Sequence, residues 1–232
     1  MLKSIRFIIF LFIIITWHPS CSQDSYKNQR EKMVEEQIEQ RGITDAITLN
    51  AMRLVPRHLF VPEKMIPYAY EDRPLAIGYG QTISQPFIVA YMTSIINPSH
   101  HFKILEVGTG SGYQAAVLAE IVDTIYTIEI IPELAINASR TFNKLGYKNI
   151  ISKQGDGYFG WSEHSPFDAI IVTAAVEEIP EPLIKQLKNG GKMIIPVGAK
   201  NLPQSLMLIT KKKQKIVQEY LIPVRFVPFL RE

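Results

Sequence analysis

The second half of the sequence alternates short apolar runs with longer segments of helical spacing. Runs with the length and composition of strands lie at residues 103–107, 124–130, 150–153, 169–173 and 192–197. Helical patterns separate them at residues 113–121, 132–145 and 180–187. Because parallel strands need crossover connections, this alternation predicts an α/β fold with a Rossmann-like, doubly wound, mostly parallel sheet and helices on both faces.

The C-terminal region predicts the edge of this sheet. Apolar runs at residues 206–210 and 216–223 flank the lysine-rich run 211–215, which is typical of a hairpin that forms an antiparallel edge. We interpret the lysines as its solvated turn. With no internal repeat and a length suited to one domain, residues 22–232 are expected to form a single domain.

An N-terminal helical extension precedes the alternating region. Residues 25–53 are charged, with apolar residues at helical spacing and an interruption near Gly42, which predicts two short helices. Several prolines between residues 56 and 74 exclude a long helix and indicate a wrapping loop. The apolar run 87–96 predicts a helix packed on the sheet.

A glycine-rich loop follows the first predicted strand of the alternating region. It reads GTGSG, with Gly108, Gly110 and Gly112 ahead of a helical pattern. Glycines permit a tight turn and let a ligand approach the backbone amides of a helix N-terminus. Nineteen positions after Gly110, at the end of the next strand, Glu129 is placed to accept from both hydroxyls of a ribose. The pattern indicates an adenosyl ligand, with an ordinary strand-to-helix turn as the alternative.

The loop spacing and a second acid favour S-adenosylmethionine over a dinucleotide. A dinucleotide loop reads GxGxxG, whereas this loop reads GxGxG and is preceded by Glu106. A carboxylate there suits the amino group of a methionine moiety and would repel a pyrophosphate. Asp156, in the GDG sequence after the third strand, is placed to accept from an adenine amino group, although such a sequence is also common in simple turns.

Five segments resemble protein-L-isoaspartate O-methyltransferases: VPRHLFVP (55–62), GQTISQP (80–86), LEVGTGSGY (105–113), GDG (155–157) and VRFVP (224–228). The resemblance spans about residues 29–229, and QTISQP is its most particular part. It implies methyl transfer from S-adenosylmethionine to the free carboxylate of L-isoaspartyl residues in damaged proteins, which begins their repair. A carboxylate is already ionised at neutral pH, so this reaction needs no general base.

The resemblance also implies roles for individual residues. Ser84 is assigned to the active site, where its hydroxyl would orient the substrate carboxylate or hold the nearby backbone. Thr82 and Ile83 would close over the methionine end of the cofactor. Arg225 and Val227 would help to hold the peptide. The remaining cofactor-binding residues it implies are Glu106, Gly108, Gly110, Gly112, Glu129, Asp156 and Gly157.

Other kinds of partner are not expected. The formal net charge of +3 gives no electrostatic footprint for nucleic acid. His100 and His101 are adjacent rather than at ligand spacing, so no metal site is predicted. A monomer is expected. A nicotinamide-dependent oxidoreductase would share the strand, glycine loop and acid, but the GxGxG spacing and the lack of recognisable hydride-transfer residues disfavour it.

Residues 1–21 have the order of an export signal. Lys3 and Arg6 precede the apolar run 7–17, which is too short to span a bilayer comfortably. Cys21, the only cysteine, loosely resembles a lipoprotein cleavage site, so a lipid tether at the N-terminus is one possibility. The signal predicts a periplasmic or lipid-anchored protein, whereas the family implies a cytoplasmic one, where S-adenosylmethionine is made. Export also leaves open a non-catalytic module of the same fold that binds altered peptides.

Overall fold

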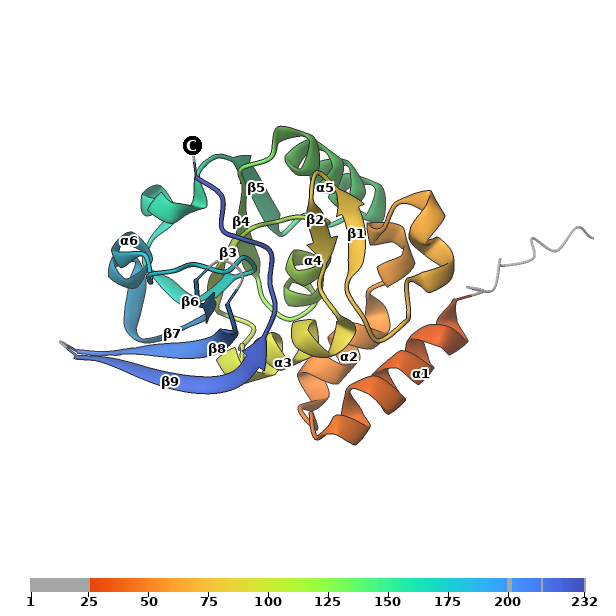
Figure 1. Cartoon of the computed structure of the whole chain (residues 1–232), viewed down its shortest axis with the longest axis horizontal. Coiled ribbons are helices and arrows are strands. Elements are labelled where there is room, and N and C mark those ends of the chain that lie inside the picture. Colours follow the sequence, from red (N-terminus) through yellow and green to blue (C-terminus); the bar gives the residue numbers. More distant parts are fainter. Residues whose placement is uncertain (1–25, 200–201, 214, 232) are drawn as a thin grey trace, which may run out of the picture.

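The computed structural model describes residues 26–199, 202–213 and 215–231. The predicted signal and Cys21 lie outside these residues. Figure 1 shows α1 (Lys27–Gln37) and α2 (Ala46–Leu54) packed at one end, with a long hairpin projecting at the other. No helix within the described ranges is both long and apolar enough to cross a membrane.

A seven-stranded sheet forms the centre, in the order β5-β4-β3-β6-β7-β8-β9. Its strands are β3 (Lys103–Val107), β4 (Thr124–Glu129), β5 (Ile150–Gln154), β6 (Phe167–Val172), β7 (Leu187–Val197), β8 (Gln204–Lys212) and β9 (Lys215–Val224). The strands from β5 to β7 run parallel, and β8 and β9 add an antiparallel edge. The predicted fold class is therefore confirmed.

Alternate residues of the central strands enter two separate cores. In β3, Ile104 belongs to the core on one face and Leu105 to the core on the other. Such alternation is what a sheet covered on both faces requires. Helices α1 to α5, including α3 (Pro86–Ile96), α4 (Tyr113–Ala119) and α5 (Pro132–Leu145), all contribute to the first core.

The second face has a thinner helical cover than the sequence predicts. The helix expected over residues 180–187 is only α6 (Glu181–Lys185), because β7 already begins at Leu187. Two short 3-10 turns, η4 (Gly157–Phe159) and η5 (Ser162–His164), precede β6 in the chain. Trp161, between these turns, packs against the second core.

The lysine-rich run is not only a solvated turn. The Nζ of Lys211 donates to the carbonyls of Ile184, Lys185 and Leu187, at 3.1, 3.0 and 2.8 Å. A cation at the C-terminus of a helix satisfies its free carbonyls and interacts favourably with its dipole. Lys212 and Lys213 are exposed as predicted, but β8 extends to Lys212, so of these two only Lys213 lies in the turn, and the interpretation is wrong for Lys211.

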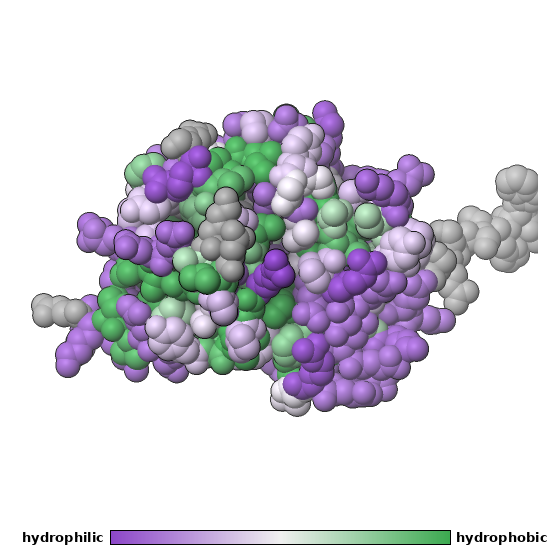
Figure 2. Space-filling model, viewed as in Figure 1, coloured by the Kyte–Doolittle hydropathy of each residue, from purple (hydrophilic) through white to green (hydrophobic). Residues whose placement is uncertain are grey.

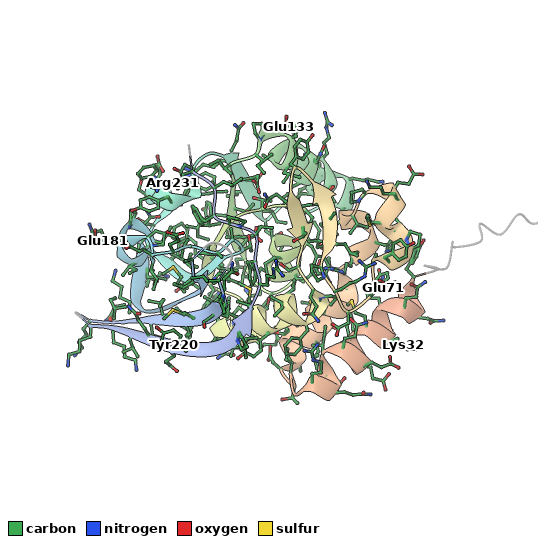
Figure 3. The ribbon with its side chains drawn as sticks, in the orientation of Figure 1. Lys32, Glu71, Glu133, Glu181, Tyr220 and Arg231 are labelled. Carbon is green, nitrogen blue, oxygen red and sulfur yellow. The ribbon has the colours of Figure 1, made fainter. Side chains whose placement is uncertain are left out.

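Hydrophilic residues gather over the N-terminal helices, whereas apolar residues are more frequent around the middle of the molecule (Figure 2). Figure 3 shows Lys32, Glu133 and Glu181 at the rim of the molecule. A two-stranded sheet of β1 (Leu75–Gly78) and β2 (Gln81–Ile83) lies beside the N-terminal helices (Figure 1). Strand β2 is formed by the first three residues of the QTISQP segment.

Candidate functional site

A cavity opens at the carboxyl ends of the central strands. It encloses about 770 Å³, including the part open to solvent, and is lined by the residues that follow β3, β4 and β6. From β3 the chain continues to β4 and β5 on one side of β3, and then returns to form β6 on the other side of β3. Ligands of open α/β sheets bind at such a switch point.

The glycine loop forms the floor of the cavity. Gly108 has a φ of +96°, and a Cβ there would lie 2.3 Å from Thr173 Oγ1. The same hydroxyl donates to the carbonyl of Gly108 at 2.6 Å, which ties the loop to the end of β6. The backbone can therefore approach this closely only because residue 108 has no side chain.

Glu129 holds the loop as well as facing the cavity. It is 5% exposed; its Oε2 accepts from the backbone N–H of Gly110 at 2.7 Å and its Oε1 from that of Ile131 at 2.9 Å. Each carboxylate oxygen keeps acceptor capacity beyond one hydrogen bond. Glu129 therefore fixes the loop in place and still offers acceptors to a ligand, a double role that the sequence did not predict.

Glu106 is fully buried at the back of the same cavity. Its Oε2 accepts from the hydroxyl of Thr127, which is itself hydrogen-bonded to the hydroxyl of Thr109, and its Oε1 has no partner. Burial, assisted by the nearby Glu129, raises the pKa of Glu106 to about 8. The sequence predicts a carboxylate at this position, whereas without a ligand the side chain is mostly protonated at neutral pH.

The segment after β1 supplies the opposite wall. Thr82, Ile83 and Ser84 all line the cavity, at the end of β2 and just beyond it. Val227 also lines it, since the chain after β9 runs back across the middle of the molecule (Figure 1). Ala175 holds this returning segment by hydrogen bonds to Val227 and Phe229, both at 2.8 Å.

A second groove meets the cavity at four shared residues. Thr82, Ser84, Thr173 and Val227 line both hollows, so they form the junction. Arg225 does not line the cavity but is exposed on this groove. A second molecule lying in the groove would therefore reach the cavity at Ser84.

Three predicted site residues, Gly112, Asp156 and Arg225, do not line the cavity; of these, Asp156 is engaged elsewhere. Its Oδ1 accepts from the backbone N–H of Tyr158 at 2.9 Å, and its Oδ2 pairs with Arg231 Nε at 2.8 Å. It thus caps η4, as Asp commonly does at the start of a helical turn. Its neighbour Gly157 does line the cavity.

The sequence missed Thr173 and Thr127, which connect the loop and the buried acid to neighbouring strands. Thr173 could have been found because it is the last residue of a predicted strand, at the carboxyl end where ligands bind. For Thr127, in the interior of β4, the sequence carries no such signal.

The adjacent histidines lie at the other end of β3 and β4. Nδ1 of His100 and Nδ1 of His101 lie 3.0 and 3.5 Å from the carboxylate of Asp123, and all three residues are exposed. Spacing in the sequence therefore did not reveal that these groups meet. The absence of a functional metal site stays a prediction.

The model of the family "Protein-L-isoaspartate(D-aspartate) O-methyltransferase (PCMT)" matches residues 28–232. The chain belongs to this family. A protein-L-isoaspartate O-methyltransferase of Opitutus terrae is 53% identical over 222 residues, which are 96% of this chain and 95% of that relative.

Solved protein-L-isoaspartate O-methyltransferase structures share the fold. One is 32% identical to this chain, with a TM-score of 0.79. The match covers 86% of this chain and 65% of the other, so this chain spans about two thirds of that protein. A second, from Plasmodium falciparum and in complex with S-adenosyl-L-homocysteine, is 27% identical with a TM-score of 0.77, covering 88% of this chain and 99% of that one.

Proposed function

We propose that this protein transfers a methyl group from S-adenosylmethionine to the free carboxylate of L-isoaspartyl residues in damaged proteins. The observation that carries the proposal is the cavity, in which the glycine loop, Glu129 and the unpartnered Oε1 of Glu106 meet in a chain of this family. The family membership leaves no support for the nicotinamide-dependent alternative.

The residues of the cavity fit an S-adenosylmethionine molecule. An unpartnered buried oxygen, such as Oε1 of Glu106, is costly unless a ligand donates to it, and an ammonium group is a strong donor. Glu129 offers acceptors to the hydroxyls of a ribose. When bound, the cofactor supplies a methyl group on a sulfonium centre.

The protein itself has mainly to position the acceptor. The isoaspartyl carboxylate is ionised at neutral pH and can attack without losing a proton to the enzyme. Correct placement of two reacting groups contributes about 7–11 kcal/mol. Ser84 stands at the junction of groove and cavity, where its hydroxyl can donate to one carboxylate oxygen and leave the other free to react.

Methylation turns the carboxylate into an ester with a better leaving group. The neighbouring backbone amide of the substrate can then displace the alcohol and close a succinimide ring. Hydrolysis of that ring restores some normal aspartyl linkage. These later steps occur in the substrate and need no residue of this protein.

The direct test is methyl transfer from labelled S-adenosylmethionine to a peptide with one L-isoaspartyl residue. The same peptide with a normal aspartyl residue is the control. We expect labelling of the first peptide and none of the second. Binding of the isoaspartyl peptide without labelling would favour the non-catalytic module instead.

Replacing Ser84 by alanine should lower kcat/KM for the isoaspartyl peptide by about 10- to 100-fold, since a hydrogen bond to a charged group contributes about 1.5–3 kcal/mol. The affinity for S-adenosylhomocysteine should stay within about threefold. Ser94→Ala is the matched control, because Ser94 lies on α3 and donates to the carbonyl of Tyr91 away from the cavity. Equal kcat/KM values for the two variants would contradict the role of Ser84.

Cofactor binding should also depend on the protonation of Glu106. An ammonium group stabilises the ionised form, so binding releases the proton that the buried side chain holds below its pKa of about 8. The affinity for S-adenosylhomocysteine should therefore fall about tenfold for each pH unit below 8. Titration calorimetry in buffers of different ionisation enthalpy measures the released proton, and Glu106→Gln should remove both the release and the slope. Affinity independent of pH from 6 to 8 in the unaltered protein would contradict this.

We also propose that the protein is exported and acts as a monomer. Lys3, Arg6 and the apolar run 7–17 support export, and a lipid at Cys21 would tether the chain to a membrane. Cell fractionation tests export, the mass of the mature N-terminus tests the lipid at Cys21, and the mass of the native protein tests the monomeric state. An uncleaved chain in the cytoplasm would overturn export.

A further inference from the structure

Arg57 is the largest fully buried side chain of a charged residue in the described part of the chain. It begins η2 (Arg57–Phe60), within the VPRHLFVP segment, and its exposed fraction is 0%. Burial lowers its pKa to about 10, so it remains cationic at neutral pH. None of the ion pairs in the described residues includes Arg57. A buried charge without a carboxylate partner is costly, which calls for a functional or structural reason.

The contacts of Arg57 connect three segments around the cavity. Its Nε donates to the carbonyl of Ala69 at 2.8 Å, and its Nη2 donates to the carbonyl of Ser84 at 2.7 Å. Its guanidinium carbon lies 4.9 Å from the ring centroid of Tyr113, the first residue of α4 after the glycine loop. The guanidinium therefore spans from the peptide of Ser84 to the helix that carries the cofactor loop.

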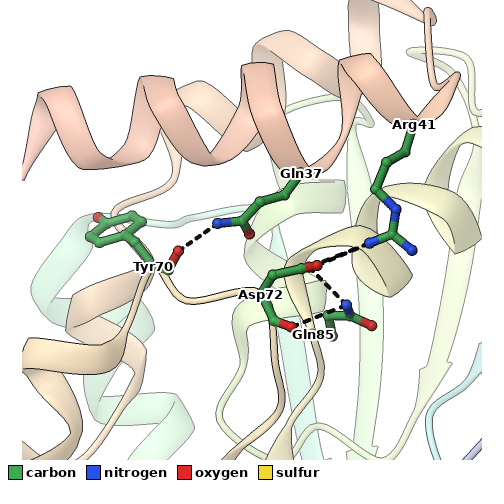
Figure 4. Close-up of polar contacts among 5 residues, drawn as sticks. All are labelled: Gln37, Arg41, Tyr70, Asp72 and Gln85. Atoms are coloured by element: carbon green, nitrogen blue, oxygen red, sulfur yellow. Dashed lines mark hydrogen bonds and ion pairs between the residues drawn. The ribbon is translucent and has the colours of Figure 1, made fainter.

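A second set of contacts supports the same segment from the surface (Figure 4). The side-chain amide of Gln85 donates to Oδ1 of Asp72 at 2.7 Å, and Arg41 pairs with Oδ2 of Asp72 at 3.1 Å. Gln37 of α1 donates to the carbonyl of Tyr70 at 2.8 Å. The N-terminal helical extension thus reaches the peptide next to Ser84 through residues 70–72.

We propose that Arg57 is a positioning residue that fixes the backbone of Ser84, so that its hydroxyl faces the acceptor carboxylate at the junction of groove and cavity. The inference rests on the proposed function. An arginine suits this task because its planar guanidinium donates in two fixed directions at once, whereas a lysine ammonium is a flexible point charge. Asp72 supports the same peptide from outside through Gln85.

The test compares Arg57→Lys with Arg30→Lys. Arg30 is a matched control because it is also buried, donates from Nε to a backbone carbonyl, that of Arg53, at 2.6 Å, and donates from Nη1 to the hydroxyl of Tyr70 at 3.3 Å. We expect kcat/KM for the isoaspartyl peptide to fall at least tenfold further in Arg57→Lys than in Arg30→Lys. The affinity for S-adenosylhomocysteine should stay within about threefold in both variants.

Two further readouts separate positioning from general damage. Backbone amides of residues 81–85 should exchange hydrogen faster in Arg57→Lys but not in Arg30→Lys. In a Ser84→Ala background, Arg57→Lys should cause little further loss of kcat/KM, because the hydroxyl that it positions is already gone. Full additivity of the two substitutions, or unchanged exchange in residues 81–85, would overturn the inference.

A surface variant keeps the test decisive if Arg57→Lys does not fold. Asp72→Ala removes the contact to Gln85 from an exposed position, where it should cost little stability. Glu71→Ala is its control, since this neighbouring carboxylate pairs with Arg73 instead. We expect kcat/KM to fall by about three- to tenfold in Asp72→Ala and to stay unchanged in Glu71→Ala. Equal kcat/KM values of both variants would count against the support of the Ser84 backbone by Asp72 and Gln85. Unaltered protein that binds cofactor but does not label the peptide would instead overturn the proposed function, and the inference with it.

Discussion

Replacing Glu129 by glutamine should lower the affinity for S-adenosylhomocysteine by about 100-fold or more, since two charge-assisted hydrogen bonds contribute about 1.5–3 kcal/mol each. The carboxylate accepts from Gly110 and Ile131 in the described structure and has acceptors left for a ribose. A glutamine can accept at only one of its two terminal atoms, so an N–H of the backbone would face its NH₂ group. The substitution therefore disturbs the loop and the ligand contact together. Titration calorimetry measures the effect.

Glu133→Gln is the control for this substitution. Glu133 lies in the first turn of α5, four positions after Glu129, and is exposed at the rim of the molecule (Figure 3). Its loss should leave the affinity for S-adenosylhomocysteine unchanged. Equal affinities of the two variants would mean that Glu129 makes no contact with the ligand.

Replacing Gly112 by alanine should lower the free energy of unfolding by about 2–5 kcal/mol, because a left-handed backbone costs about 1–2 kcal/mol for a residue with a Cβ and overpacking adds about 1–3 kcal/mol. Gly112 has a φ of +87°, and a Cβ there would lie 2.5 Å from Cε1 of Phe142. Phe142 is a buried residue of α5 and cannot move into solvent without opening the core.

Gly146→Ala isolates the backbone part of this cost. Gly146 ends α5 with a φ of +82° and has no atom within 4 Å of the position of a Cβ. It should lose only about 1–2 kcal/mol. Urea denaturation of both variants gives the two values. If Gly112→Ala is no less stable than Gly146→Ala, the loop does not pack against α5 as described.

The parts of the fold with strong local patterns could be predicted from the sequence. The bounds of α5 and β3 agree with the predicted ranges, because an amphipathic period and a short apolar run are local properties. The β1–β2 hairpin was missed. Its two-residue turn is Tyr79-Gly80, with both φ values positive, and a tyrosine there lacks the Asn-Gly signal of such turns.

Part of the candidate site could be predicted from the sequence. Gly108 and Glu129 were predicted from their places at strand ends and Ser84 from the family resemblance, and the structure brings them to one cavity. The protonation of Glu106 depends on its burial by several elements of the fold, which a local sequence pattern does not predict. The same holds for Arg57, whose sequence neighbours give no sign that its side chain turns inward to the carbonyl of Ser84.

The most direct test of the central claim is a crystal structure with S-adenosylhomocysteine. We expect the nucleoside in the cavity above residues 108–112, with its ribose hydroxyls donating to Glu129 and its ammonium group close to Oε1 of Glu106. A ligand bound elsewhere, or an empty cavity at saturating ligand concentration with Glu129 holding only Gly110 and Ile131, would contradict it.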